Sequence, residues 1–184
     1  MKTKLLVIGS GMFVNGQNSN TRGVILPSIY QFLKKEISTI DLYLTYRGEN
    51  GKNNNKKCCD FLKMDKLTKI TQIKSDYSLK SIKDIIELHK IDSAIVSLPD
   101  HLHFSTCKVL LENSINILVV KPFVLKKEQA IELTNLQEQK KLIGQVEFHK
   151  RWDISNRYLK SEIIKDSIGK ILKIDVRYSQ NKKL

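Results

Sequence analysis

The sequence predicts an α/β protein built on a doubly wound parallel sheet, because short apolar runs alternate with segments of helical periodicity. The apolar runs are nearly continuous, as in parallel strands that helices cover on both faces, and they lie at 5–8, 40–46, 94–98 and 115–120. Apolar residues recur at helical spacing between and after these runs, over 24–37, 79–91, 104–111 and 129–142. Strand and helix therefore follow one another in the order that this fold class requires.

Two asparagine-rich stretches interrupt the pattern, at 15–20 and 50–57. Asparagine, glycine and lysine favour turns and rarely fill a core, so we expect both stretches to be surface loops. The first one lengthens the connection after the opening strand, and helical periodicity resumes only near Gly23.

The end of the chain follows a different pattern. A strand at 145–148 leads to a helix over 154–164 and then to a strand of alternating polarity over 170–178. Alternation predicts one buried and one solvated face, unlike the earlier strands. We therefore predict two domains, 1–148 and 149–184. The second would be the beginning of an incomplete α/β domain, and we expect a truncated protein.

Composition narrows the classes of function. The 184 residues carry a formal net charge of +13, but the lysines are spread along the chain. No nucleic-acid-binding motif accompanies them, so we expect no nucleic-acid partner. The sequence contains neither an apolar run of about 18 residues nor a signal peptide, so we expect a cytoplasmic protein without a membrane partner.

Cysteine and histidine spacing gives no metal site. Cys58, Cys59 and Cys107 match neither a disulfide framework nor a metal-binding pattern, so we expect reduced thiols. His101 and His103 have the spacing of two metal ligands, but no cysteine or acidic residue recurs at ligand-like spacing. The sequence therefore predicts no bound metal.

A glycine motif directly follows the first predicted strand, in the sequence Gly9-Ser-Gly-Met-Phe-Val14. In Rossmann domains the first glycine of such a motif allows a tight turn, and the second lets the backbone approach the diphosphate of a dinucleotide. Gly9, Gly11, Met12 and Phe13 are therefore candidate cofactor-binding residues for NAD or NADP. Valine stands where a third glycine or alanine is usual, so an alternative is that the glycines serve the chain turn alone.

Arg47 follows the second predicted strand, where a Rossmann domain usually places an aspartate or glutamate that binds the ribose hydroxyls. An arginine here has two interpretations. It binds the 2′-phosphate of NADP, or it is a solvated loop residue.

Two motifs follow the later strands. Pro99 and His103 lie four residues apart after one strand, and Val120-Lys121-Pro122 follows the next. These motifs resemble those of the Gfo/Idh/MocA oxidoreductases, in which the first reads V-x-x-P-x-x-x-H and the second reads E-K-P, so that Val120 here replaces the glutamate. The segment 146–153 is similar to the one that joins the family's two domains. The resemblance covers nearly the whole chain in order. It implies an NAD(P)-dependent oxidoreductase that acts on sugars or cyclitols.

The resemblance also implies roles for individual residues. It makes Lys121 the candidate catalytic residue, because a cation near the reacting carbon can orient a hydroxyl and stabilise alkoxide charge. Together with the glycine motif, it gives as cofactor-binding candidates Gly9, Gly11, Met12, Phe13, Arg47, Leu98, Pro99, His103, Lys121 and Pro122. The substrate-binding candidates are Lys121, His149, Arg151 and Trp152.

The sequence lacks one part of the implied chemistry. Family members carry an aspartate and a histidine four residues apart in the second domain, and this sequence has no histidine beyond His149. Hydride transfer from an alcohol needs a base for the hydroxyl proton. Two hypotheses follow. One is an oxidoreductase or its cofactor-binding portion, with a sugar-like small molecule as substrate. The other is a non-catalytic nucleotide-binding or interaction module. For either, we expect a homo-oligomer or a partner chain that supplies the rest of the second domain.

Overall fold

The computed structural model describes residues 2–16, 23–36 and 40–177. Residues 17–20 of the expected loop at 15–20 and residue 178 of the expected strand at 170–178 lie outside these ranges. The chain divides into two compact units, Met1–Glu147 and Phe148–Leu184, and each is described by itself.

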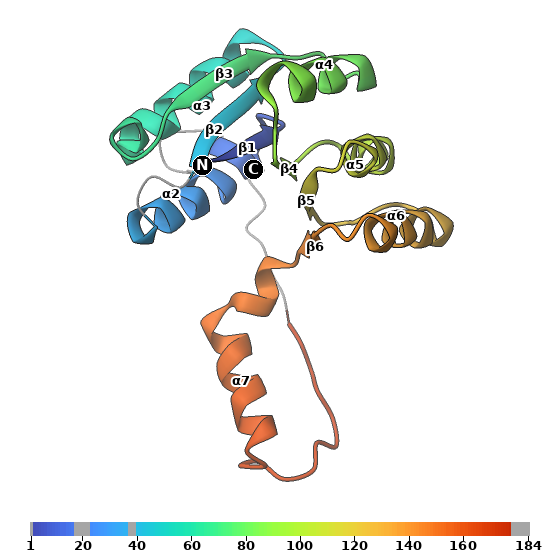
Figure 1. The fold of residues 1–184 in the computed structure, drawn as a ribbon. Helices are drawn as coiled ribbons and strands as arrows, with labels where there is room; N and C mark the ends of the chain where they lie inside the picture. Colours follow the sequence, from blue (N-terminus) through green and yellow to red (C-terminus); the bar gives the residue numbers. More distant parts are fainter. Residues whose placement is uncertain (1, 17–22, 37–39, 178–184) are drawn as a thin grey trace, which may run out of the picture. The chain divides into compact units, whose positions relative to one another are not determined.

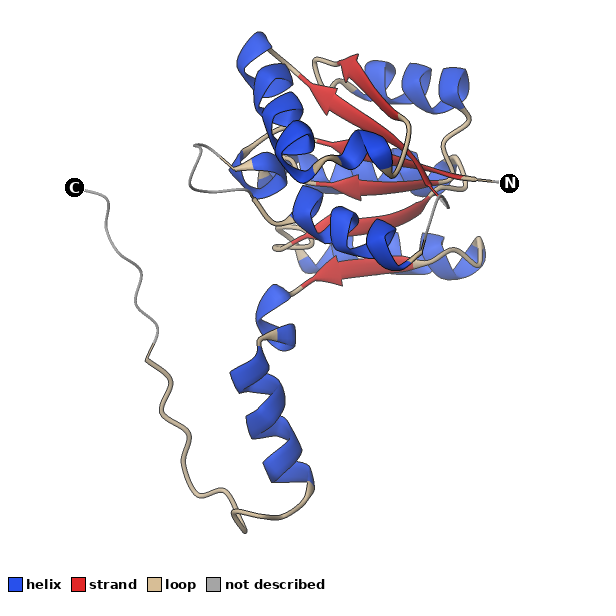
Figure 2. Cartoon of the chain, turned by 90° about the vertical axis from the view of Figure 1, so that its left-hand side faces the viewer, coloured by secondary structure: helices blue, strands red, loops and turns tan. Residues whose placement is uncertain are grey.

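The first unit is built on a six-stranded sheet in which every strand pair is parallel (Figure 2). The strands, in chain order, are β1 (Thr3–Ile8), β2 (Ile40–Tyr46), β3 (Ile70–Lys74), β4 (Ser93–Val96), β5 (Asn116–Val120) and β6 (Gly144–Glu147). Their order in the sheet is β3-β2-β1-β4-β5-β6, so the chain reverses its winding direction between β1 and β4. The predicted doubly wound parallel sheet is confirmed. Ligands of such sheets bind where the winding reverses, at the carboxyl ends of the strands.

Helices cover both faces of this sheet (Figure 1). They are α1 (Met12–Asn15), α2 (Ile25–Lys35), α3 (Glu49–Leu62), α4 (Leu79–His89), α5 (His103–Glu112) and α6 (Lys127–Gln139). Alternate residues of β1 point to opposite faces, as the geometry of a strand requires. Leu6 and Ile8 pack in one core cluster with α4, α5 and α6, and Leu5 and Val7 pack in the other with α2 and α3.

The asparagine-rich stretch 50–57 is helical, so its assignment as a surface loop was wrong. It forms most of α3. Two kinds of contact hold this helix against the sheet, a buried hydrogen bond and the packing of two cysteines. Asn55 is fully buried and donates from Nδ2 to the Thr45 backbone oxygen, at 3.3 Å. Cys58 and Cys59 pack into the core on the same side. These tertiary contacts outweigh the poor helix propensity of asparagine.

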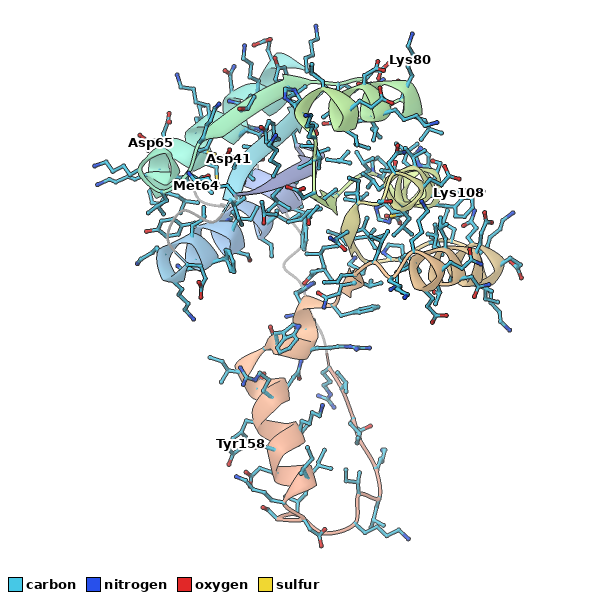
Figure 3. The ribbon with its side chains drawn as sticks, in the orientation of Figure 1. Asp41, Met64, Asp65, Lys80, Lys108 and Tyr158 are labelled. Atoms are coloured by element: carbon cyan, nitrogen blue, oxygen red, sulfur yellow. The ribbon has the colours of Figure 1, made fainter. Side chains whose placement is uncertain are left out.

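The second unit contains α7 (Ile154–Ile164) and a following segment without regular structure. The expected strand at 170–178 is absent over its described part, 170–177. A strand needs a neighbour for its backbone hydrogen bonds, and none is paired with this segment in the described chain. No residue of 148–177 is buried, and Tyr158 is 66% exposed. Figure 3 shows the position of Tyr158 on α7.

Removal of the second unit is expected to leave the first unit stable. A chain ending at Phe148 should unfold within about 2 °C of the full chain, because residues beyond 148 belong to neither core cluster. Calorimetry measures the two unfolding temperatures. Trypsin should cut the full chain first at Lys150, Arg151 and Arg157, and mass spectrometry of the fragments would identify these sites. A control chain ending at Leu142 loses β6 and should melt several degrees lower. A large drop for the chain ending at Phe148 would contradict the division.

Candidate functional site

A cavity of about 570 Å³ opens beside the carboxyl ends of β1, β4 and β5, where the winding of the sheet reverses. Its size is typical of small-molecule sites. The cavity is lined by Gly9, Ser10, Gly11, Met12, Phe13, Asn15, Gly16, Asn50, Gly51, Asn54, Tyr77, Ser97, Leu98, Pro99, Val120 and Lys121. It therefore brings together most of the glycine motif with the segments that follow β4 and β5.

Gly9 forms the tight turn at the end of β1. Its φ is +121°, and a Cβ added there would lie 2.1 Å from the Ser97 backbone oxygen. The Gly9 N–H donates to Thr45 Oγ1 at 2.9 Å, and that hydroxyl donates to the Val7 oxygen at 3.0 Å. The turn is thus held between β2 and β4, and only glycine fits at its first position.

Gly11 has a different function in the same turn. Its φ is −80°, which other residues also adopt, and a Cβ added there would meet no protein atom within 4 Å. The space beside Gly11 is therefore open to a ligand. Met12 and Phe13 continue the lining into α1, whereas Val14 is fully buried in the core at the position of the usual third glycine.

One helix contributes lining residues that the sequence analysis missed. Asn50, Gly51 and Asn54 of α3 form part of the cavity wall. Tyr77, from the segment after β3, also lines the cavity, and its hydroxyl lies 3.3 Å from Ser10 Oγ. The signal available was the spacing of asparagines at 50 and 54, which places both on one face of a helix.

Lys121 is the only charged residue among the described residues that line the cavity. It follows β5 directly, and the Lys121–Pro122 peptide bond is cis. The cavity therefore carries a positive charge that suits an anionic ligand. Open space beside Gly11 fits the diphosphate of a dinucleotide, and the cation in the same lining suits the negative charge of the ligand as a whole.

Two predicted cofactor-binding residues do not line the cavity although they lie next to it. His103 is 0% exposed, and both of its ring nitrogens contact backbone oxygens. Pro122 supplies one of those oxygens. The predicted residues Leu98 and Pro99, by contrast, belong to the wall itself.

Arg47 lines a second hollow, of about 640 Å³, between β3 and α4. Asp76 lies in the same hollow and accepts a hydrogen bond from the Ser78 N–H, at 2.9 Å. That bond holds the pKa of the Asp76 carboxyl below its usual range, with a smaller contribution from the charge of Arg47. Arg47 is therefore not among the residues of the cavity wall.

The predicted substrate residues other than Lys121 belong to the second unit. His149, Arg151 and Trp152 form a 3-10 turn, His149–Trp152, ahead of α7. Trp152 is 73% exposed, and the Arg151 guanidinium lies 4.8 Å from the centre of the Phe148 ring. Their roles toward a substrate stay predictions.

Cys59 and Cys107 offer no nucleophile at neutral pH. Burial raises the pKa of Cys107 to about 12, and burial together with the neighbouring Cys58 raises that of Cys59 to about 12. Both therefore stay protonated.

Within the described ranges, no three histidine, cysteine, aspartate or glutamate side chains come together as a metal site would require. None of the described helices is both long and apolar enough to cross a membrane.

A doubly wound sheet with a glycine turn and a positively charged cavity at its reversal point defines a dinucleotide-binding Rossmann domain. The model of the Gfo/Idh/MocA oxidoreductases, a family with an NAD-binding Rossmann fold, matches residues 49–148. The chain belongs to this family.

Similar proteins extend this assignment. The uncharacterised oxidoreductase YdgJ of Escherichia coli K12 is 27% identical over 105 residues, which are 55% of this chain and 30% of YdgJ. Scyllo-inositol dehydrogenase from Lactobacillus casei, solved with NAD(H) and scyllo-inositol, superposes with a TM-score of 0.64 at 19% identity. An oxidoreductase from Bacteroides fragilis NCTC 9343 superposes with a TM-score of 0.63 at 20% identity. Each superposition covers 92% of this chain, but only 43% and 42% of the two solved chains. The chain thus spans less than half the length of these relatives.

Proposed function

We propose that this chain is the cofactor-binding portion of an NAD(P)-dependent oxidoreductase that transfers hydride to or from a carbon of a sugar or cyclitol. One observation carries the proposal: the glycine turn and Lys121 line the same cavity. The family assignment supports the cofactor class, and the relative crystallised with scyllo-inositol supports the substrate class. NAD and NADP both remain candidates, since Arg47 lies in the neighbouring hollow and the α3 wall presents neutral amides.

The chain's own residues have separable tasks in this function. The nicotinamide ring, when bound, accepts or donates the hydride. Backbone N–H groups of the turn after Gly9 bind the diphosphate, and the open space beside Gly11 admits it. Lys121 orients the substrate hydroxyl and stabilises negative charge that develops on its oxygen. His149, Arg151 and Trp152 are proposed to contact the substrate.

The described lining of the cavity contains none of the three residue types that most often accept the hydroxyl proton. Among the described lining residues there is no histidine, aspartate or glutamate. This observation favours a second candidate function, a module that binds the dinucleotide without catalysing a reaction. Incubation with NAD⁺ or NADP⁺ and a panel of sugars and cyclitols separates the two candidates, because only an oxidoreductase would form the reduced cofactor, which is followed by its absorbance.

Nucleotide binding is the direct test. NADH or NADPH at about a hundredfold above its Kd should stabilise the chain by about 2.7 kcal/mol, a rise in Tm of roughly 5–10 °C. Lys121→Met should weaken binding about three- to tenfold, because it removes the charge of the lining. Lys108→Met, on the exposed surface of α5, is the matched control and should leave the Kd unchanged. The proposal fails if neither cofactor stabilises the chain at millimolar concentration.

We further propose that a second polypeptide, either another copy or a partner chain, completes the second unit, and that 1–148 and 149–184 are separate domains. Large apolar side chains there are solvent-exposed, among them Ile154, Leu172 and Val176. Protection of 150–177 from trypsin that rises with chain concentration would support self-association, and unchanged cleavage would contradict it.

Free buried cysteines support a reducing, cytoplasmic location, which labelling of the thiols in unfolded protein from cell extracts would test.

A further inference from the structure

His103 occupies a bridging position beside the cavity. It is the first residue of α5, and its side chain is fully buried. Its Nδ1 lies 2.7 Å from the Pro122 backbone oxygen, and its Nε2 lies 2.9 Å from the Leu98 backbone oxygen. Both nitrogens of one ring thus contact the main chain of two different segments.

These two segments form adjacent parts of the cavity wall. Leu98 belongs to the segment after β4, and Pro122 follows Lys121 in the segment after β5. The paired register of β4 and β5 ends at Val96 and Val119, before either segment begins. His103 is therefore a direct link between the two segments beyond the ends of the strands.

The chemistry of the ring defines what a replacement must reproduce. A carbonyl oxygen accepts hydrogen bonds only, so each contact needs an N–H from the ring. A neutral imidazole has one N–H and donates to one carbonyl at a time, whereas its protonated form donates to both. Phenylalanine fills a similar space with no donor, and glutamine offers an amide NH₂ with two. The two variants therefore separate the hydrogen bonds of His103 from its packing.

We infer that His103 is a positioning residue that holds the Leu98–Pro99 segment against Lys121–Pro122 and so orients Lys121 toward the redox ring of the cofactor. The inference rests on the proposed function. The glycine turn is at the centre of the sheet, with the α3 and Tyr77 walls on the β2 side and the two bridged segments on the β5 side. A dinucleotide with its diphosphate at the turn extends one nucleoside to each side. His103 acts on the nicotinamide side only.

The test compares two ligands on the full chain. NADH contains the nicotinamide nucleoside, and ADP-ribose lacks the nicotinamide ring but keeps the diphosphate and adenosine. His103→Phe should raise the Kd of NADH about tenfold and leave that of ADP-ribose within about twofold, measured by titration calorimetry. His103→Gln should restore part of the NADH affinity. His101→Phe, in the exposed turn just before α5, is the matched control and should change neither Kd.

The possible outcomes separate the inference from the proposed function. Equal losses for both ligands, or no loss for either, would mean that His103 only packs, and would overturn the inference. If His103→Phe does not fold, the same comparison with His103→Gln decides, since a selective loss of NADH affinity is still expected. Failure of the unaltered chain to bind either ligand would overturn the proposed function, and the inference with it.

Discussion

Replacing Gly9 with alanine is expected to destabilise the first unit by about 4 kcal/mol, a large share of the stability of a typical domain. Two effects add. The new Cβ would lie 2.1 Å from the Ser97 backbone oxygen, and the backbone of residue 9 has a φ of +121° that side chains disfavour. Relief requires β1 and β4 to separate, because Ser97 also donates its N–H to the Ile8 oxygen at 2.8 Å. Urea unfolding of the full chain measures the loss.

Gly11→Ala is the matched control for this substitution. Its Cβ meets no protein atom within 4 Å, and its backbone conformation is an ordinary one, so the free energy of unfolding should change by less than about 0.5 kcal/mol. Equal stability of the Gly9→Ala variant and the unaltered chain would show that the turn after β1 differs from the one described.

Gly11→Val is expected to have the opposite profile, with stability nearly unchanged and nucleotide affinity reduced about a hundredfold. The valine side chain would fill the space beside Gly11, which the proposed function assigns to the diphosphate. Its bulk would also keep the ligand from the backbone N–H groups of the turn. The Kd of NADH measured by titration, together with the urea midpoint, separates the two effects.

A control for this variant is Gly48→Val. Gly48 also has open space around its Cβ position and an extended backbone, but it lies outside the cavity lining. Its substitution should leave the Kd within about threefold. Unaltered NADH affinity in Gly11→Val would refute the placement of the diphosphate at this turn.

Periodicity predicted the layered fold because β1, β2, β4 and β5 consist mainly of apolar residues. It missed β3 (Ile70–Lys74), in which four residues are half-buried and Lys74 is exposed, and whose sequence mixes threonine and glutamine with isoleucine. The asparagine-rich composition of 50–57 predicted a loop, because composition does not reveal that Asn55 has a hydrogen-bond partner on β2. The strand at 170–178 was expected from alternation alone, which does not supply the neighbour that a strand requires.

The candidate site was predictable to the extent that its residues follow strands directly. Gly9, Gly11, Leu98 and Lys121 occupy the carboxyl ends of strands, which a parallel sheet brings to one edge. The sequence could not distinguish residues that line the cavity from residues that lie behind its wall. His103 was expected to bind the cofactor, but both of its ring nitrogens contact backbone oxygens. The α3 wall was missed together with the helix itself.

The buried side-chain amides behind the glycine turn affect the entropy cost of binding a ligand in the cavity. Asn15 donates from Nδ2 to Asn55 Oδ1 at 2.7 Å and to the Ser10 oxygen at 3.1 Å, while Asn55 donates to β2. The loop, the helix beside it and the sheet are thereby braced together before any nucleotide arrives. A preorganised cradle of this kind loses little conformational entropy on association, so more of the contact energy remains as affinity. Asn15 and Asn55, from the two stretches expected to be surface loops, thus support the wall of the cavity from behind.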